Sequence, residues 1–256
     1  MDRKKFKANF EGVDEFLIAS LCDDIELCEQ IEYPVYTKYF YPPQITKKIL
    51  DIAIGNLRFK KYGLNDDCEK NMIAIYPSEF EEILDFPVVF FKIQNGSKFK
   101  ELAHKDYLGS ILGIGIKREL LGDLIVENDC CYGVASEESF KIIEEKLQIV
   151  GRNPVVVSKI TKDEVPQGKY EEIFTTVASL RLDNIVPSLI NLSRNKALEL
   201  IENGSVSVNY SLEKDKSRIL KKEDVITISK KGKYIFVKQE GESKKGKLRI
   251  YIKKFN

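Results

Sequence analysis

Four polar residues in the last third of the chain have types and spacing that suit phosphate binding. Arg181 opens one helical segment, and Arg194 and Lys196 lie in the first turn of the next, just after the candidate N-cap Ser193. Cations near the positive end of a helix dipole are unfavourable by roughly a few tenths of a kcal/mol. A bound phosphate would relieve that conflict, because free amides, the dipole and the cations would all point at it. The alternative is an ordinary solvated helix end.

Hydrophobic spacing predicts how these residues are positioned. Two short helical segments flank the turn 191–193, and Gly204 follows the second, where a left-handed residue commonly ends a helix. An alternating strand comes next. The apolar positions of the two helices and the strand are Leu182, Ile185, Leu189, Ala197, Leu198, Ile201, Val206 and Val208.

This stretch resembles the S-four RNA-binding domain, also called the alpha-L motif. The positions that match its pattern are Arg181-Leu182-Asp183, Ser193-Arg194, Ala197, Leu200-Ile201, Gly204, Val206, Val208-Asn209, Leu220-Lys221, Asp224, Ile226 and Ile228. Tyr210 departs from it, because many members carry glycine there, and Pro187 removes an amide donor inside the first helix. The resemblance implies an RNA-binding module in which Asn209 and Tyr210 contact RNA beside the helix pair.

Lysines gather in the loops of the same module. Those that we expect to contact RNA are Lys221, Lys222, Lys230, Lys231, Lys233, Lys244, Lys245 and Lys247. The last six lie on two loop tips, where we expect a phosphate-gripping rim; soluble hairpin ends are the alternative. Such lysines position the RNA backbone without reading bases, so specificity should come mostly from RNA shape.

Charge is distributed unevenly along the chain. The whole sequence carries +1, whereas residues 175–256 hold 18 lysines and arginines against nine acidic residues. The rest of the chain therefore has an excess of eight negative charges, with 23 basic against 31 acidic residues. A basic module on an acidic body is typical of a polyanion-binding protein. The S-four resemblance implies that the polyanion is RNA, and no DNA partner is expected. The acidic body is expected to face a protein partner or to set orientation.

Composition indicates a soluble, cytoplasmic protein of two or three small domains. No run approaches the ~20 apolar residues of a membrane span, and the first residues lack the apolar core of a secretory signal. The five cysteines form no C-x-x-C pair, so we expect reduced thiols, no metal site and no cofactor.

The predicted fold class is α+β, in three parts at 1–80, 81–166 and 175–256. The first part is an α/β region that begins with a helix to about residue 32. A second helix over 44–54 and a pair of strands follow it. Those two strands are expected at 56–63 and 71–76.

The second part has the element order β-α-β-β-α-β of a ferredoxin-like sheet, which RNA-recognition motifs share. Its helices are expected over 104–115 and 139–150, with Ser139 or Ser136 near the start of the second. The aromatic signature of true recognition motifs is not visible in its strands, so no stacking residues are assigned there. A polar stretch, 166–172, reads as a linker to the basic module.

Residues 104–126 form the second distinctive stretch. Its three glycines, Gly109, Gly113 and Gly115, do not have dinucleotide-loop spacing, and close helix packing is the simpler explanation. His104 is the sole histidine and has no obvious nucleophile or base partner, so no catalytic residue is predicted. The stretch resembles the middle domain of the YlmH proteins, S-four proteins found beside bacterial cell-division genes. That resemblance covers about 95–256 well and the first ~80 residues in outline.

The resemblance implies a noncatalytic RNA-binding protein. Related S-four proteins bind large ribosomal subunits and help to rescue stalled ones, so ribosomal RNA or tRNA on that subunit is the expected partner. An RNA-modifying enzyme is the first alternative, although neither a pseudouridine synthase nor a methyltransferase signature is visible. A scaffold for division proteins is the second.

Overall fold

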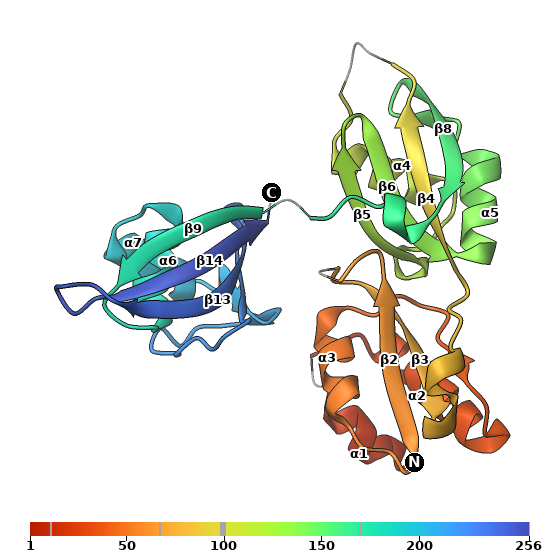
Figure 1. The fold of residues 1–256 in the computed structure, drawn as a ribbon, viewed down its shortest axis with the longest axis horizontal. Coiled ribbons are helices and arrows are strands. Elements are labelled where there is room, and N and C mark those ends of the chain that lie inside the picture. The colour runs from red at the N-terminus through yellow and green to blue at the C-terminus, as the bar shows by residue number, and fades with distance from the viewer. Residues whose placement is uncertain (11, 67, 98–100, 169, 256) are drawn as a thin grey trace. The chain divides into compact units, whose positions relative to one another are not determined.

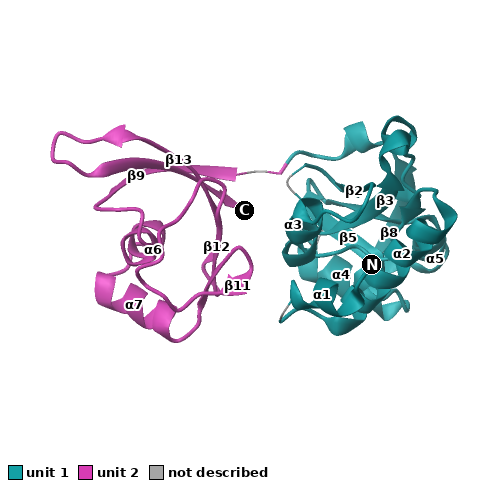
Figure 2. Ribbon diagram, turned by 90° about the horizontal axis from the view of Figure 1, so that it is seen from below, with its two compact units in different colours: residues 1–167 teal, residues 168–256 magenta. Residues whose placement is uncertain are grey.

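The computed structural model describes residues 1–10, 12–66, 68–97, 101–168 and 170–255. The chain divides into two compact units, residues 1–167 and 168–256 (Figure 2). The three-part division stays a prediction, because this grouping keeps the first two parts together. None of the helices that the described residues form is both long and apolar enough to cross a membrane.

The beginning of unit 1 packs helices against a small sheet (Figure 1). Its elements are α1 (Arg3–Ala8), α2 (Glu15–Ile31), β1 (Val35–Tyr36), α3 (Pro43–Asp51), β2 (Leu57–Gly63), β3 (Asn71–Pro77) and the 3-10 helix η1 (Ser78–Ile83). β3 lies between β1 and β2 and is antiparallel to both, which confirms the predicted strand pair. Leu21 and Ile25 of α2 share a buried core with Ile75 of β3.

The single helix predicted to residue 32 is wrong, because the chain forms two helices there. Gly12 has φ +75°, outside the helical region, and interrupts the first run. Asp14 then caps α2, with its carboxylate accepting a hydrogen bond from the Phe16 amide at 2.9 Å. The helix predicted over 44–54 is α3, which ends three residues earlier, at Asp51.

The rest of unit 1 forms the predicted ferredoxin-like sheet. Its elements are β4 (Val88–Asn95), α4 (His104–Gly113), η2 (Arg118–Leu120), β5 (Leu121–Glu127), β6 (Cys130–Ser136), α5 (Glu137–Lys146), β7 (Ile149–Val150), β8 (Asn153–Ile160) and η3 (Lys162–Glu164). The strand order is β5-β6-β4-β8-β7 with antiparallel neighbours, the split βαβ arrangement. Tyr107 of α4 and Ile143 of α5 pack with Phe91 in one core, so both helices cover one face.

The helix predicted over 139–150 is α5, which starts after Ser136, one of the two expected starts, but ends earlier than predicted. Ser136 caps α5, because its Oγ accepts from the Ser139 amide at 3.3 Å. The helix ends at Lys146, and Ile149 and Val150 instead form β7, paired with β8. The periodic apolar residues at the end of this run therefore belong to a strand.

The stretch 104–126 attaches the first part of unit 1 to the sheet. Asp123 accepts hydrogen bonds from the backbone amides of Glu69 and Lys70, the second at 3.2 Å. Arg118 fixes its own turn by donating to the carbonyl oxygens of Leu121 and Gly122 at 2.9 and 3.1 Å. Burial raises the pKa of Asp123 above its ordinary value. These hydrogen bonds give the stretch 104–126 a structural role, because they hold its own turn and join it to the first part of unit 1.

The packing explanation for the glycines of this stretch is wrong. A Cβ added at Gly109 or Gly113 would meet nothing within 4 Å, so close packing does not require glycine there. Gly115 has φ +98°, which L side chains rarely adopt, and this accounts for its glycine. The structure gives no reason for the other two.

Unit 2 is a twisted antiparallel sheet with two helices (Figure 1). Its elements are β9 (Tyr170–Val177), α6 (Leu182–Ile190), α7 (Arg194–Glu202), β10 (Val206–Val208), β11 (Ser211–Leu212), β12 (Val225–Ile228), β13 (Gly232–Glu242) and β14 (Leu248–Phe255). The strands lie in the order β11-β10-β12-β13-β14-β9. Ile185 of α6 and Ala197 of α7 share a core with Ile226 and Ile250, so the helices cover one face of the sheet.

The linker predicted over 166–172 extends too far into unit 2. Its last residues belong to β9, which pairs with β14 along eight residues, from Tyr170 opposite Phe255 to Val177 opposite Leu248. β9 thus continues the basic module at the edge of its sheet.

Candidate nucleic-acid interface

One buried carboxylate holds two arginines together at the starts of α6 and α7. Arg181, the N-cap residue of α6, donates from Nε and Nη2 to the two oxygens of Asp183 at 3.0 and 3.2 Å. Arg194, the first residue of α7, donates from Nη2 to Asp183 Oδ2 at 2.8 Å. Two segments separated by a turn thereby present their cations side by side. We call Arg181, Asp183, Arg194 and Lys196 the arginine corner.

The cationic side of the arginine corner faces solvent. The Asp183 side chain is 3% exposed, whereas those of Arg181 and Arg194 are 40% and 62% exposed. The Arg181 guanidinium, helped by that of Arg194, holds the pKa of Asp183 below its ordinary value despite burial, so the carboxylate stays ionised. Asp183 takes two of the five N–H donors of Arg181 and one of those of Arg194. The exposed remainder of each guanidinium has the fork geometry that binds phosphate.

Ser193 has a structural role at the start of α7, as its sequence position predicts. Its backbone is extended, and its Oγ accepts from the Lys196 amide at 3.5 Å. The Lys196 side chain is exposed on the first turn of the same helix. The first-turn amides and the helix dipole add positive potential at this end, which favours an anion there. The RNA contact predicted for Ser193 therefore competes with its capping bond.

Asn209 and Tyr210 form the tight turn between β10 and β11. Both have positive φ, 51° and 66°, the geometry of a hairpin turn that strongly prefers Asn-Gly. The Asn209 side chain donates to Asp224 Oδ1 at 2.8 Å and accepts from the Val225 amide at 3.1 Å. We therefore revise its assignment: its amide positions the turn, and RNA contact is left to Tyr210.

The two lysine loops do not form the single rim expected from the sequence. Lys230 and Lys231 lie in the turn before β13, and 244–247 lies in the turn after it. β13 has 11 residues, so the two turns are separated by roughly 30 Å at the usual strand rise. Lys233 is the third lysine of the first group, and its Nζ lies 4.0 Å from the centre of the Phe255 ring. The lysines are two separate groups at opposite ends of one strand.

Lys221 and Lys222 are connected to the arginine corner through the backbone. The segment before them runs beside the start of α6, with the Leu220 amide donating to the Leu180 carbonyl oxygen at 2.9 Å. An isolated β-bridge joins Arg181 to Ile219 in the same segment. Both lysines are exposed, so they extend the basic surface from the corner.

The loop before this segment adds two cations that sequence reasoning missed. Lys216 pairs with Glu202 at 3.5 Å, and Arg218 pairs with Glu213 at 3.1 Å. The backbone carbonyl of Lys216 accepts from the Asp183 amide at 3.1 Å, which places this loop against the arginine corner. The density of basic residues in 214–218 was the available signal, but its distance in sequence from α6 concealed the contact.

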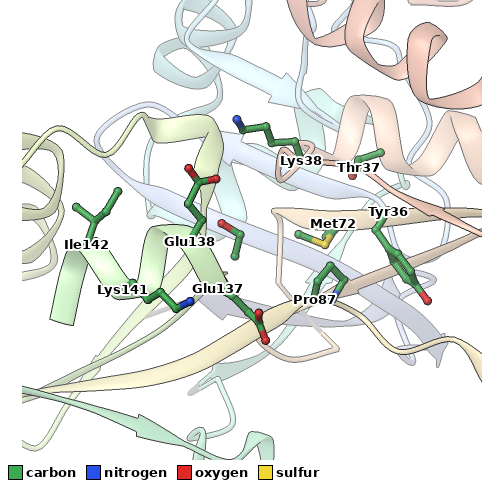
Figure 3. A pocket seen from close by; sticks show the side chains of 10 residues that line it. Tyr36, Thr37, Lys38, Met72, Pro87, Glu137, Glu138, Lys141 and Ile142 are labelled. Atoms are coloured by element: carbon green, nitrogen blue, oxygen red, sulfur yellow. The ribbon is translucent and has the colours of Figure 1, made fainter. Parts of the chain in front are cut away.

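Unit 1 contains an open pocket of about 690 Å³ (Figure 3). Its lining includes the cations Lys38 and Lys141 and the anions Glu137 and Glu138. Thr37, also in the lining, uses its hydroxyl within the fold, accepting from the Ile73 amide at 3.0 Å. The lining has both charges, and the Thr37 hydroxyl is used within the fold, so the pocket indicates no particular class of ligand. The arginine corner therefore remains the candidate site.

Comparison with known proteins finds two matching domain families. The family described as the putative RNA-binding domain in YlmH matches residues 77–164, and the S4 domain family matches residues 180–226. The Bacillus subtilis (strain 168) protein named ribosome-associated protein quality control protein P2 is 30% identical over 191 residues, covering 73% of this chain and 74% of that protein. This chain belongs to the YlmH-like family of S-four RNA-binding proteins. The resemblance inferred from the sequence is thereby confirmed.

Two further likenesses of this YlmH-like protein are narrower. A Mycoplasma genitalium protein named uncharacterized RNA pseudouridine synthase MG209 is 41% identical over 58 residues, which is 23% of this chain and 19% of that protein. A solved structure of the cell division protein ylmH from Streptococcus pneumoniae is 20% identical and has a TM-score of 0.49. It covers 59% of this chain and 93% of the solved one.

Proposed function

We propose that this YlmH-like protein is a noncatalytic, ribosome-associated RNA-binding protein whose arginine corner grips the phosphates of ribosomal RNA or tRNA on the large subunit. The observation that carries the proposal is the shared use of Asp183 by Arg181 and Arg194. A buried carboxylate fixes both guanidinium groups before RNA arrives, which lowers the side-chain ordering cost of binding. The name of the Bacillus subtilis relative, which describes ribosome-associated protein quality control, supports the ribosome as the place of action. We extend the proposal to a part in the rescue of stalled ribosomes.

The noncatalytic assignment rests on the extent of the likenesses. The pseudouridine synthase likeness spans 19% of that protein, too little to include a larger catalytic fold. The likeness to the Bacillus subtilis protein spans 74% of that chain, and its name describes association with the ribosome. We therefore favour binding over modification of RNA.

The test removes the two exposed cations of α7. We expect Arg194→Ala combined with Lys196→Ala to weaken co-sedimentation with purified large ribosomal subunits by about tenfold in affinity, because two charge-assisted phosphate contacts are lost. In filter binding with a ribosomal RNA fragment, the slope of log affinity against log salt should fall by roughly 1.5. The matched control is Lys4→Ala with Lys7→Ala, which removes two exposed charges from α1, outside both matched families. Unchanged affinity and slope in the α7 variant would refute the proposal.

A further inference from the structure

The face of the unit 2 sheet opposite its helices carries an exposed aromatic pair. Phe174 of β9 and Tyr251 of β14 are direct cross-strand partners. Their rings are stacked, with centroids 4.8 Å apart and an interplanar angle of 8°. The Phe174 side chain is 62% exposed, which is unusual for a ring that contributes nothing to the core.

Strand register places two more aromatic rings on that same face. Tyr170 and Phe255 are cross-strand partners, each four residues from a member of the first pair, so all four side chains point the same way. Their rings meet edge to face at 5.0 Å. The alternate residues of β14, Ile250 and Ile252, point to the opposite face and are buried in the core with α6 and α7. Figures 1 and 2 show both helices on that opposite side of the sheet.

Cations are interleaved with these rings. The Lys253 Nζ lies 5.1 Å from the centre of the Tyr170 ring, and the Lys233 Nζ lies 4.0 Å from that of Phe255. Lys238 is the cross-strand partner of Tyr251 on β13, and Arg249 is two residues before Tyr251 on β14. Because successive side chains of a strand point to opposite faces, the four cations lie on the same side of the sheet as the rings.

Two acidic residues also lie at this face, Glu172 and Glu240. Glu172 accepts a hydrogen bond from the Tyr251 hydroxyl at 2.6 Å, so it fixes the tilt of the stacked ring. Lys238 is also paired with Glu240, at 3.0 Å. With Glu172 and Glu240 counted against Lys233, Lys238, Arg249 and Lys253, two acidic residues stand against four basic ones, so the face keeps a positive excess. We call these four aromatic and four basic residues the aromatic face.

We propose that the aromatic face is a second RNA-contact surface, which stacks unpaired bases of single-stranded RNA on Phe174 and Tyr251 while its cations bind the flanking phosphates. Flat exposed rings with interleaved cations are the combination that proteins use to bind single strands without sequence preference. A surface that docks a protein groove would be mainly apolar, whereas this face is also basic. Duplex RNA has no unstacked base faces for the rings to contact. The charge and the rings together therefore favour single-stranded RNA. This inference builds on the proposed RNA-binding function but uses different residues, so the two can fail separately.

The experiment exploits the absence of tryptophan from the whole chain. Phe174→Trp puts a single indole on the aromatic face of the full-length protein. We expect an unstructured oligouridine to quench its emission as bases stack, whereas a fully paired RNA hairpin does not. The matched control is Phe16→Trp, at a 56% exposed phenylalanine of α2 that also lies against a tyrosine, Tyr39. Its emission should be insensitive to both RNAs.

A second variant measures the energetic contribution. Phe174→Ala should weaken oligouridine binding about tenfold, the effect typical of losing one stacking partner. Circular dichroism checks that the variant is folded, and Phe174→Tyr should restore the affinity because it restores a ring. The quench should persist when Arg194 and Lys196 are both alanine, which separates this inference from the arginine corner. Unquenched Phe174→Trp emission at saturating oligouridine, or unchanged affinity of Phe174→Ala, would overturn the proposal.

Discussion

At the scale of single residues, Asp183 organises the basic surface although it is an anion. The sequence pattern singles out the cations around it, because cations bind phosphate, whereas Asp183 is only one matched position of the S-four pattern. In the structure its two oxygens bind Arg181 and Arg194 together, and Asn184 Nδ2 donates to Oδ1 at 3.2 Å. A buried acceptor with fixed partners is therefore what gives the exposed guanidinium groups a defined geometry.

Replacing Asp183 tests this positioning role. We expect Asp183→Asn to lower the stability of unit 2 by about 2 kcal/mol at neutral pH, since it removes charge-assisted hydrogen bonds from a buried acceptor. RNA affinity should fall as well, although the surface gains positive charge, because the arginines lose their shared anchor. Denaturation followed by circular dichroism and filter binding measure the two effects. Glu199→Gln, on the exposed side of α7, is the control that removes a negative charge without disturbing the corner.

The pKa of Asp183 fixes how this stability depends on pH. The pKa is lower in the folded chain than its ordinary value, so ionised Asp183 stabilises the fold above the unfolded pKa. That contribution is lost as pH falls through the folded pKa, below about 4. The parent protein should therefore lose stability on acidification more steeply than Asp183→Asn. Tighter RNA binding by the variant, or parallel pH profiles, would contradict the assigned role.

At the scale of elements, β9 is a strand of unit 2 that the sequence did not predict. Its eight residues pair with β14, and Val177 contributes to the core. The sequence concealed it because Tyr170, Glu171 and Glu172 follow a polar, glycine-containing run and resemble a linker. Its inward positions, 173, 175 and 177, include a threonine, so the apolar alternation is weak.

Removing β9 should destabilise the basic module. We expect a fragment 178–256 to melt about 10–20 °C below a fragment 168–256, since it loses an edge strand and a buried valine worth roughly 2–3 kcal/mol together. It should also self-associate more, because the edge of β14 becomes unpaired. Thermal melts and sedimentation velocity measure these outcomes. Equal melting temperatures would show that β9 is dispensable for the fold.

Some features of the helices and strands could be predicted from the sequence, and others could not. Helix starts marked by Ser136 and Ser193 were readable, because a cap is a local interaction between neighbouring residues. The separation of the lysine turns was not, because it depends on how far β13 extends before the chain reverses. The break between α1 and α2 at Gly12 was missed because the flanking apolar residues keep a helical spacing.

At the scale of the whole molecule, charge is divided between the two units. Residues 168–256 carry 19 lysines and arginines against 11 acidic residues, and residues 1–167 carry 22 against 29. The units thus have net charges of +8 and −7, which nearly cancel in the intact chain. At low salt an anionic unit joined to a cationic one reduces the general attraction for polyanions.

This division of charge predicts that the RNA affinity of unit 2 alone differs from that of the full chain. The fragment 168–256 should bind random-sequence RNA more tightly than the full chain at low salt, because the acidic unit is absent. The difference should shrink as salt is added, because the screening length falls to about 8 Å at physiological ionic strength and about 3 Å at 1 M. Filter binding across a salt series measures it. A constant difference at all salt concentrations would mean that unit 1 affects binding by contact rather than by charge.

The two lysine turns at opposite ends of β13 also set a minimum size for an RNA that engages both. A separation of roughly 30 Å is close to the length of one turn of a nucleic-acid duplex. If both turns bind RNA as we propose, shorter oligonucleotides should neutralise one turn at a time and show only part of the affinity of a longer RNA. A footprint on a long, folded RNA should accordingly show two protected patches with an accessible stretch between them.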